Sequence, residues 1–307
     1  MRPLAVVGNV NVDLIMGPAA PWPQPGTETI VDHDELRVGG SAGNSALAWM
    51  ALGTPFEIAA SIGADQFGTW LAKGFGDHAR HWPVHGESTT LSVGITHPDG
   101  ERTFFTTRGH LPLFSLADVL AVLDGPRLEG GIALLCGSFL TEKLVEDYDR
   151  FFDWADRHDI AVALDTGWPL DGWTERNKAA ARKWLSRCRI ALFNEVETTS
   201  LAGVSDPAEA GQVLRQGMPA DAIVVVKCGP RGAIAVDANG TVFRADAPHV
   251  TVVDTIGAGD VFNAAFLAAF AAGEGLEASL VAGISVASRA ISTHPRTYAL
   301  PLQEAMA

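Results

Sequence analysis

Short, almost continuous apolar runs alternate with longer stretches of helical pattern through the second half of the chain. The runs expected to form strands are 132–136, 160–164, 190–193, 223–226 and 234–236, and helices are expected at about 142–157, 178–186 and 195–201. Apolar strands that alternate with helices are typical of a mostly parallel sheet covered by helices. The pattern therefore predicts an α/β fold whose ligands bind at the carboxyl ends of the strands.

Two other segments alternate polar and apolar residues. They cover 27–37 and 89–107, and the second contains a turn signal at 98–100 before a return strand at 103–107. Such alternation predicts antiparallel strands with one solvent-exposed face. We expect the two segments to pair into a small protruding sheet, a lid over the strand ends. The chain shows no linker and no repeat, so 1–307 is expected to form one domain with the lid, at about 14–38 and 88–110, inserted in it.

The remaining apolar segments predict further buried elements. Residues 4–7 predict a first strand, whereas 45–52 and 261–271 predict helices that are apolar nearly all round. Asn9 follows the first run closely, so we interpret that run as a strand rather than as a signal peptide. No apolar run approaches the roughly 18 to 20 residues needed to cross a bilayer.

A glycine-rich turn opens the second of these helices. A β-branched run at 250–253, expected to be a strand, leads into Gly257, Ala258 and Gly259 and then directly into the helix. Backbone N–H groups left unpaired at a helix N-terminus favour an anion, as does the helix dipole. Asp260 lies on the first turn of this helix, either as a cap that offsets the dipole or in a chemical role.

A second glycine-rich turn, with Gly39 and Gly40, precedes Asn44 and the helix at 45–52. In one interpretation it is a tight turn with Asn44 as the helix N-cap. In the other, the glycines let a polyol approach the backbone while Asn44 hydrogen-bonds its hydroxyl groups.

Asn9, Asn11 and Asp13 come just after the first strand, and alternate residues there point the same way. They are either solvated turn residues or a polar array that matches the hydroxyl groups of a sugar.

The composition of the chain limits the classes of binding partner that we expect. The chain has 307 residues, 47% of them apolar, and a formal net charge of -14 from 22 basic and 36 acidic residues. Nucleic acids and anionic membranes require a basic face, so neither is an expected partner. The three cysteines show no metal-ligand spacing and are typical of reduced thiols in the cytoplasm. His78, His81 and His85 are not expected to bind a metal, because Pro83 interrupts a helix there and no carboxylate joins them.

The two glycine-rich motifs together resemble the signatures of the ribokinase-like, PfkB-type carbohydrate kinases. The motifs are Gly39-Gly40 with Asn44, and Asp254-Thr255-Ile256-Gly257-Ala258-Gly259-Asp260. Supporting matches occur at 8–13, 25–26, 63–68, 100–102, 194–197 and 229–232. The resemblance implies a three-layer α/β fold with a β lid, ATP and Mg²⁺ as cosubstrates, and phosphorylation of a sugar or sugar-like alcohol.

The resemblance also implies roles for individual residues. Asp260 would accept the proton of the attacking hydroxyl, while the backbone N–H groups of Gly257, Ala258 and Gly259 hold the transferring phosphoryl group. The residues expected to bind the acceptor are Asn11, Asp13, Gly39, Gly40 and Asn44.

The expected nucleotide-binding residues are Asn194, Lys227, Gly229, Gly232 and Asn263. Glu197 is expected to reach the metal through water, although Asn194 and Glu197 also form a sequence capping box that requires no function. Asn263 is alternatively a buried amide bonded to its neighbours, and Lys227 a solvated strand end. Asp165, at a strand end, is a further candidate for contact with nucleotide or metal, and Trp168 either lines a pocket or only packs.

The sequence departs from the family in several places. Ile256 replaces a usual threonine, and Ala42 stands where a glycine is common. A monovalent cation, K⁺, would bind backbone carbonyl groups at Asp254, and activation by potassium is left open. Gly137-Ser138-Phe139 replaces an acidic residue of ribokinase, which weakens ribose as the substrate.

The favoured hypothesis is an ATP-dependent kinase that transfers the γ-phosphoryl group to a primary hydroxyl of a sugar. One alternative is a nucleoside kinase in which Phe104 and Phe105 sandwich a base, and another is a non-catalytic sugar-binding protein. The open edges of the lid strands also suggest a homodimer formed through the lid.

Overall fold

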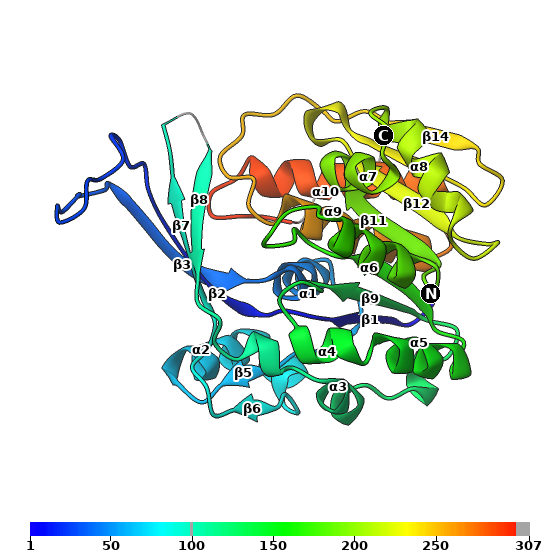
Figure 1. Ribbon diagram of the computed structural model, residues 1–307, viewed down its shortest axis with the longest axis horizontal. Coiled ribbons are helices and arrows are strands. Elements are labelled where there is room, and N and C mark those ends of the chain that lie inside the picture. Colours follow the sequence, from blue (N-terminus) through cyan, green and yellow to red (C-terminus); the bar gives the residue numbers. More distant parts are fainter. Residues whose placement is uncertain (99–100, 299–307) are drawn as a thin grey trace.

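The computed structural model describes residues 1–98 and 101–298. Among them, eight strands form the main sheet at the centre of the molecule (Figure 1). In spatial order these are β14 (Val242–Ala245), β13 (Ala233–Val236), β12 (Ile223–Lys227), β11 (Ile190–Asn194), β10 (Ala161–Asp165), β9 (Ile132–Cys136), β1 (Leu4–Val7) and β4 (Glu57–Ala59). The pairs from β12 to β4 are parallel, and β12, β13 and β14 pair antiparallel at one edge. The mostly parallel sheet predicted from the apolar runs is confirmed.

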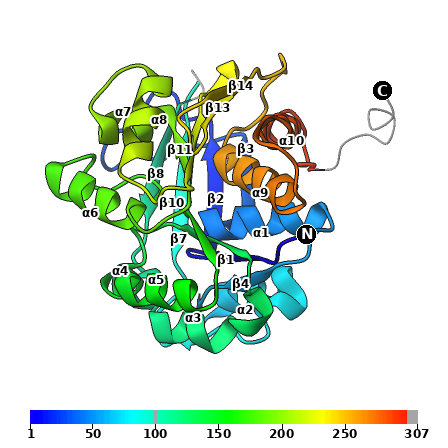
Figure 2. The same ribbon diagram turned by 90° about the vertical axis from the view of Figure 1, so that its right-hand side faces the viewer.

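Helices cover both faces of this sheet, so the fold has three layers (Figure 2). One face carries α1 (Ser41–Ala51), α2 (Gln66–Phe75), α9 (Ala258–Ala271) and α10 (Leu276–Ile291). The other carries α3 (Leu116–Val122), α4 (Glu142–Glu146), α5 (Tyr148–Arg157), α6 (Glu175–Leu185), α7 (Glu195–Ala202) and α8 (Pro207–Gln216). Short 3₁₀ turns lie at Gly76–Ala79, Leu111–Leu113, Pro126–Leu128 and Gly229–Arg231.

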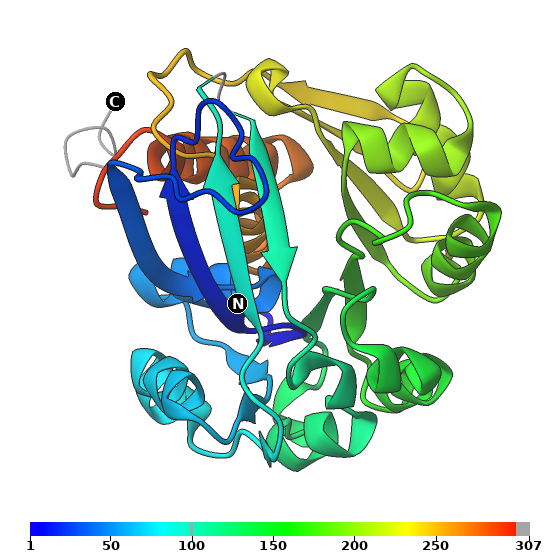
Figure 3. The same cartoon turned by 60° about the vertical axis from the view of Figure 1, so that its left-hand side comes forward.

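A second sheet, the lid, stands off the main body (Figures 1 and 3). Its strands, in spatial order, are β3 (His33–Gly39), β2 (Asn11–Gly17), β7 (Leu91–Thr96) and β8 (Arg102–Thr106). A further pair, β5 (Ile62–Gly63) and β6 (Val84–His85), is parallel. The lid joins the body where β1 passes into β2 and where β3 passes into α1, which places it at the carboxyl ends of the main strands.

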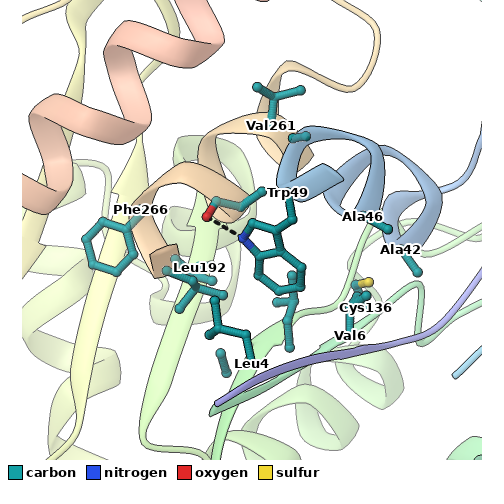
Figure 4. Packing of buried hydrophobic residues seen from close by; sticks show 14 of the residues in the cluster. Leu4, Val6, Ala42, Ala46, Trp49, Cys136, Leu192, Val261 and Phe266 are labelled. Carbon is teal, nitrogen blue, oxygen red and sulfur yellow. Dashed lines mark hydrogen bonds between the residues drawn. The ribbon is translucent and has the colours of Figure 1, made fainter. Parts of the chain in front are cut away.

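Helices α1 and α9 pack closely, although they lie more than two hundred residues apart in the sequence (Figure 4). The buried indole of Trp49 donates a hydrogen bond of 2.7 Å from Nε1 to the backbone oxygen of Ala264. Ser45 donates its hydroxyl to the backbone oxygen of Asp260 at 3.1 Å. Polar bonds inside an apolar contact fix the register of the two helices, because leaving either group unpaired there would cost free energy.

The sequence was misleading at several boundaries. Residues 250–253 form no strand. They are an irregular, largely exposed segment, and the backbone N–H of Val253 bonds instead to the backbone oxygen of Ile291 at 2.7 Å. The helix expected over 142–157 is broken into α4 and α5 at Asp147, whose backbone N–H bonds to Leu144.

The lid strands also differ from the prediction. Of the segment 27–37, only the part from His33 onward is a strand, and β2 was missed because its residues were interpreted as the turn after β1. The turn signal Pro98-Asp99-Gly100 includes two residues that lie outside the described part of the chain. Within the described ranges, no helix is both long and apolar enough to cross a membrane.

Candidate active site

Asp260 lies at the meeting point of the two glycine-rich motifs. Its carboxylate accepts a hydrogen bond of 2.9 Å from Nδ2 of Asn44, and the hydroxyl of Ser41 also bonds to it. Burial raises the pKa of Asp260 to about 6, helped by the nearby carboxylate of Asp165, while the Asn44 bond and Lys227 act in the opposite direction. A carboxylate with a pKa near 6 is still ionised at neutral pH and is a better proton acceptor than an ordinary aspartate.

The turn before Asp260 has the backbone shape that its glycine requires. Gly257 is the N-cap of α9 with φ 72°, in the left-handed region, and the helix begins at Ala258. A Cβ at position 257 would lie 2.7 Å from Nδ2 of Asn44, so the amide occupies the space that a side chain would need. The start of α9 therefore lies next to the Asn44 and Asp260 pair, and the N–H of Ala258, one of the predicted anion donors, bonds to the backbone oxygen of Thr255 at 3.1 Å.

The lid supplies a second pair of polar side chains, Asn11 and Asp13. Nδ2 of Asn11 donates to Oδ1 of Asp13 at 2.7 Å, and both side chains are buried. A Cβ at Gly39 would lie within 2.3 Å of the Asp13 carboxylate, and one at Gly40 would lie 2.4 Å from the backbone oxygen of Asn9. The predicted acceptor-binding residues are thus brought together, and the glycines are needed for this close approach.

Asn44 does not cap its helix. Helix α1 begins at Ser41 with Gly40 as N-cap, so Asn44 projects from inside the first turn toward Asp260. Of the two interpretations of this motif, the turn with an Asn44 cap is wrong. Burial raises the pKa of Asp13 to about 6, and the nearby Arg37 acts against this rise.

A buried ionic network lies near the turn and joins the ends of β10 and β12 to α9. Nζ of Lys227 donates to Oδ2 of Asp165 at 2.7 Å and to the amide oxygen of Asn263 at 3.2 Å, and Nδ2 of Asn263 donates to Asp165 at 2.6 Å. Burial lowers the pKa of Lys227, but Asp165 and Glu197 more than reverse this, so the lysine is charged. Lys227 is therefore no solvated strand end, and Asn263 is the buried, bonded amide of the second interpretation.

Glu197 and Asn194 form a complete capping box at the start of α7. The Glu197 carboxylate accepts the Asn194 N–H at 2.8 Å, and the Asn194 side chain accepts the Glu197 N–H at 2.8 Å. Burial raises the pKa of Glu197 to about 7, and the negative charge of Asp165 adds to this rise. In the part of the chain described, no three His, Cys, Asp or Glu side chains lie close enough to hold a metal ion by themselves.

A cavity of about 370 Å³ opens beside the turn. Lys227, Gly229 and Gly232 line one side, and Ala258 and Gly259 line another. Apolar side chains of α9, α10 and the preceding loop complete the wall, among them Phe262, Ile284 and Ile291. Predicted nucleotide-binding residues and the predicted anion-binding turn thus share one largely apolar cavity, as is typical of small-molecule sites.

Comparison with known proteins agrees with this geometry. The family model of the pfkB family carbohydrate kinases matches residues 1–302. The chain belongs to this family. It is therefore a phosphotransferase with an alcohol group as acceptor, and its predicted family, fold class and enzyme class are confirmed.

Individual PfkB relatives resemble the chain over nearly all of its length. It is 26% identical over 312 residues to 5-dehydro-2-deoxygluconokinase of Listeria monocytogenes serotype 4b, covering 97% of this chain and 92% of the relative. The structure of Arabidopsis thaliana ribokinase complexed with ribose and ATP superposes with a TM-score of 0.78 at 24% identity, covering 95% and 93% of the two chains. Adenosine kinase of Sinorhizobium meliloti gives 0.79 at 21% identity, covering 98% and 96%. The structural matches show a shared fold.

Sequence reasoning missed a group of arginines around Asp254. Its carboxylate accepts from Nη1 of Arg37 at 2.5 Å and from Nη2 of Arg296 at 3.0 Å, and Nη1 of Arg102 lies 3.8 Å away. Burial alone would raise the pKa of Asp254, but the Ile256 N–H and these guanidinium groups bring it below its ordinary value. The signal for Arg37 was present, since it lies two residues before Gly39 and so faces the same side of its strand.

Other sequence candidates lie apart or are oriented differently. His78 stacks on Phe56 with ring centroids 4.4 Å apart, whereas His85 faces Asp118 at 3.6 Å, so the histidines do not converge. Trp168 is half exposed and lines a second cavity, of about 430 Å³, with Asn194, Lys227 and Gly229.

Phe104 and Phe105 cannot sandwich a base between them. As neighbours on β8 they point to opposite faces of the lid. Phe104 packs over Gly94 on the face that carries Asp13, and Phe105 stacks on Trp22 on the other face, with ring centroids 6.4 Å apart.

Proposed function

We propose that the protein is an ATP-dependent sugar kinase that phosphorylates a primary hydroxyl group, with Asp260 as the general base. The observation that carries this proposal is the contact of Asn44 with Asp260 beside the Gly257 turn. It puts a proton acceptor, an amide suited to a hydroxyl group and an anion-binding helix N-terminus at one point. Phosphoryl transfer requires positioning and charge stabilisation more than covalent chemistry from the protein, and this arrangement supports both.

The proposed step is an in-line displacement. The acceptor hydroxyl oxygen forms a bond to the γ-phosphorus of ATP while the bond to the bridging oxygen of ADP breaks, and the hydroxyl proton passes to the Asp260 carboxylate. The N–H groups of Gly257, Ala258 and Gly259 would stabilise the charge on the transferring group. Asn11 and Asp13, with Gly39, Gly40 and Asn44, would hold the acceptor on the lid side.

We place ATP in the cavity between Gly229 and α10. Its apolar wall suits a purine ring, and its inner end, at Gly259, leads to the proposed anion-binding turn. Lys227 lies near Gly259, since a Cβ there would be 3.3 Å from Nζ, and its charge would offset that of the phosphates. Asn194 and Gly232 remain predicted contacts of the nucleotide, whereas the buried Asn263 would act on it only through its bonds to Lys227 and Asp165.

A divalent cation would enter with the nucleotide. Mg²⁺ retains several waters and uses one or two carboxylates together with phosphate oxygens, so it does not need a cage of protein ligands. Glu197 and Asp165 are the buried acidic groups beside Lys227, and they fit that requirement as partners through water. When bound, the cation supplies positive charge to the phosphates. We also retain the prediction that K⁺ binds backbone carbonyl groups at Asp254.

The acceptor is proposed to be a sugar or sugar-like alcohol. Relatives that carry the name 5-dehydro-2-deoxygluconokinase make that compound the first to test. A nucleoside acceptor is the alternative, because the chain shares its fold with an adenosine kinase. It is disfavoured because the two phenylalanines that would have sandwiched a base lie on opposite lid faces.

A screen of ADP release tests the proposal. The purified chain is supplied with ATP, Mg²⁺ and, in turn, pentoses, hexoses, ketoses, sugar acids and nucleosides, with and without potassium. We expect acceptor-dependent ADP release with a sugar or sugar acid. Binding of sugar and ATP without any turnover would instead support a non-catalytic sugar-binding protein.

We further propose that two copies associate through the lid. Its outer face exposes Trp22, Leu36 and Phe105, with 47%, 44% and 57% of their surfaces accessible. Exposed apolar side chains on an open-edged sheet favour association. Light scattering that shows only monomer at the assay concentration would exclude the dimer.

A further inference from the structure

We propose that the acceptor carries a carboxylate, and that Arg37, assisted by Arg296, binds it. This inference rests on the proposed kinase function and adds the chemical class of its acceptor. It comes from the guanidinium groups around Asp254, to which neither the fold nor the phosphoryl-transfer step assigns a role.

Arg37 lies on the acceptor side of the lid. The register of β2 and β3 pairs it with Asp13, and both side chains face away from the outer surface that carries Leu36. Arg37 and Arg296 are both close enough to Asp13 for their charges to act on its pKa. An acceptor lying between Asp13 and Asp260 would therefore lie beside two guanidinium groups.

One end of Arg37 has no partner. Nη1 donates to Asp254 at 2.5 Å and lies 3.6 Å from Glu35, whereas Nη2 is buried and makes no hydrogen bond to any residue that the structure describes. Buried donors are normally paired, because losing water without gaining an acceptor costs free energy. A ligand with a free acceptor oxygen would satisfy Nη2.

The surroundings favour an anionic acceptor oxygen over a neutral one. Two oxygens of Asp254 face three guanidinium groups, those of Arg37, Arg296 and Arg102, and cannot pair with all of their donors. Guanidinium groups match carboxylates in geometry and charge, and such bonds are stronger than those to neutral hydroxyl groups. The carboxylates of Asp254, Glu35 and Asp13 lie beside these arginines and offset most of their charge, so the group available to an anionic substrate is the unpaired Nη2 end of Arg37 rather than all three guanidinium groups.

The C-terminal part of the described chain closes the same space. The Tyr298 side chain hydrogen-bonds Arg296, and its pKa, raised first by burial, is also affected by Arg37 and Asp260. Tyr298 therefore lies near both the arginines and the proposed base. A polyhydroxy acid could reach Asp260 with a terminal hydroxyl while its carboxylate meets Arg37.

Matched pairs of acceptors test the inference, each differing only where a carboxylate replaces a CH₂OH group. Suitable pairs are gluconate with glucitol, and 5-dehydrogluconate with sorbose. The full chain is assayed for ADP release, and binding is measured by calorimetry with a non-hydrolysable ATP analogue, so that an answer does not depend on turnover. We expect at least a tenfold preference for the acid of a pair in kcat/KM or in Kd.

Substitution then assigns the preference to the arginine. Arg37→Met should raise KM for the acid about a hundredfold, leave KM for the neutral partner little changed and abolish the preference, and Arg37→Lys should restore part of it. Arg108→Met, which removes an exposed lid-region arginine paired with Glu142, is the matched control and should change neither. Arg296→Met is assayed in the same way. Thermal melting of every variant then separates a loss of binding from a loss of folding.

Other outcomes would overturn the inference. They are preference for the neutral member of each pair, equal loss for both members in Arg37→Met, or no binding of either acid. Efficient phosphorylation of neutral sugars alone would reject the carboxylate and leave the kinase function standing. Binding of an acid without any phosphorylation would reject the kinase function and leave the arginine site standing.

Discussion

The side-chain amide of Asn44 donates a hydrogen bond of 2.9 Å to the carboxylate of Asp260 across 216 positions of sequence. Asn44 lies on the helix that follows lid strand β3, and Asp260 on the helix that follows the proposed anion-binding turn. The bond therefore joins the proposed acceptor side of the site to its phosphoryl side. The packing of Trp49 against Ala264 one to two turns further along the same helices holds the two residues in register.

Replacement of Asp260 by Asn should lower kcat about 10²- to 10⁴-fold, the usual contribution of a general base. The amide keeps the shape of the side chain, so binding of ATP and acceptor should change little. ADP-release kinetics and calorimetry measure the two effects. Asp149→Asn, at an exposed ion pair, is the control. Retention of most of the turnover in Asp260→Asn would show that another group accepts the proton.

The rate should depend on pH through the same carboxylate. Burial raises the pKa of Asp260 to about 6, and only the deprotonated form accepts a proton. We therefore expect kcat/KM to fall below about pH 6. Asn44→Ala removes a bond that stabilises the charged form, so the acid limb should move to higher pH.

Asp13 has a similar pKa of about 6 and could produce the same limb. Profiles of Asp13→Asn and Asn44→Ala, measured side by side, separate the two. An acid limb that stays in place in Asn44→Ala and disappears in Asp13→Asn would assign it to Asp13. For stability the sign is opposite to that for activity: the buried Asp260 carboxylate destabilises the fold above pH 6, and protonation relieves this cost between pH 6 and the ordinary value of 3.8.

Gly257→Ala should damage catalysis more than folding. Alanine at φ 72° costs about 1 kcal/mol of backbone strain, and its Cβ would also push on Nδ2 of Asn44 from 2.7 Å. We expect kcat to fall about 100-fold, as when one donor of an oxyanion hole is lost. Gly203→Ala has the same strain, at φ 76°, but open space around it, so its kcat should be unchanged at a comparable loss of melting temperature. Equal kinetic losses would contradict a role for the turn.

Lys227→Met should affect both stability and nucleotide binding. Removing one partner of a buried ion pair leaves Asp165 uncompensated, which costs about 3–5 kcal/mol. We also expect a raised KM for ATP. Lys183→Met breaks an ion pair of similar length, 2.6 Å, but both its side chains are mostly exposed, so it should cost less than about 1 kcal/mol. Urea unfolding and ATP titration measure the two terms, and similar unfolding free energies for both variants would refute the buried-pair argument.

The core of this fold was predictable because its strands are apolar on both faces. The run at 132–136 has no other stable location than the middle of a covered sheet, and its bounds match β9. The segment 250–253 has equally β-branched residues but is irregular and largely exposed in the folded chain, and propensity alone cannot reveal that.

The site was predictable only where backbone geometry limits the residue type. Gly257 and Gly40 are required by positive φ and by close contacts, and this leaves a mark in the sequence. Arg296 leaves no such mark, and for Arg37 the alternation with Gly39 indicates only which face of the strand it shares. The two arginines reach Asp254 from a lid strand and from the segment after α10, and only the folded chain brings these segments together.

Only Gly40 separates the last residue of lid strand β3 from the first residue of α1. Its φ is 84°, and any side chain there would collide with the backbone of Asn9. On this side the lid is joined to the body by a single residue, packed against the connection between β1 and β2, rather than by a flexible hinge. A tilt of the lid would consequently rotate α1 and pull Asn44 away from Asp260, so that the proposed base is correctly oriented only when the lid is seated.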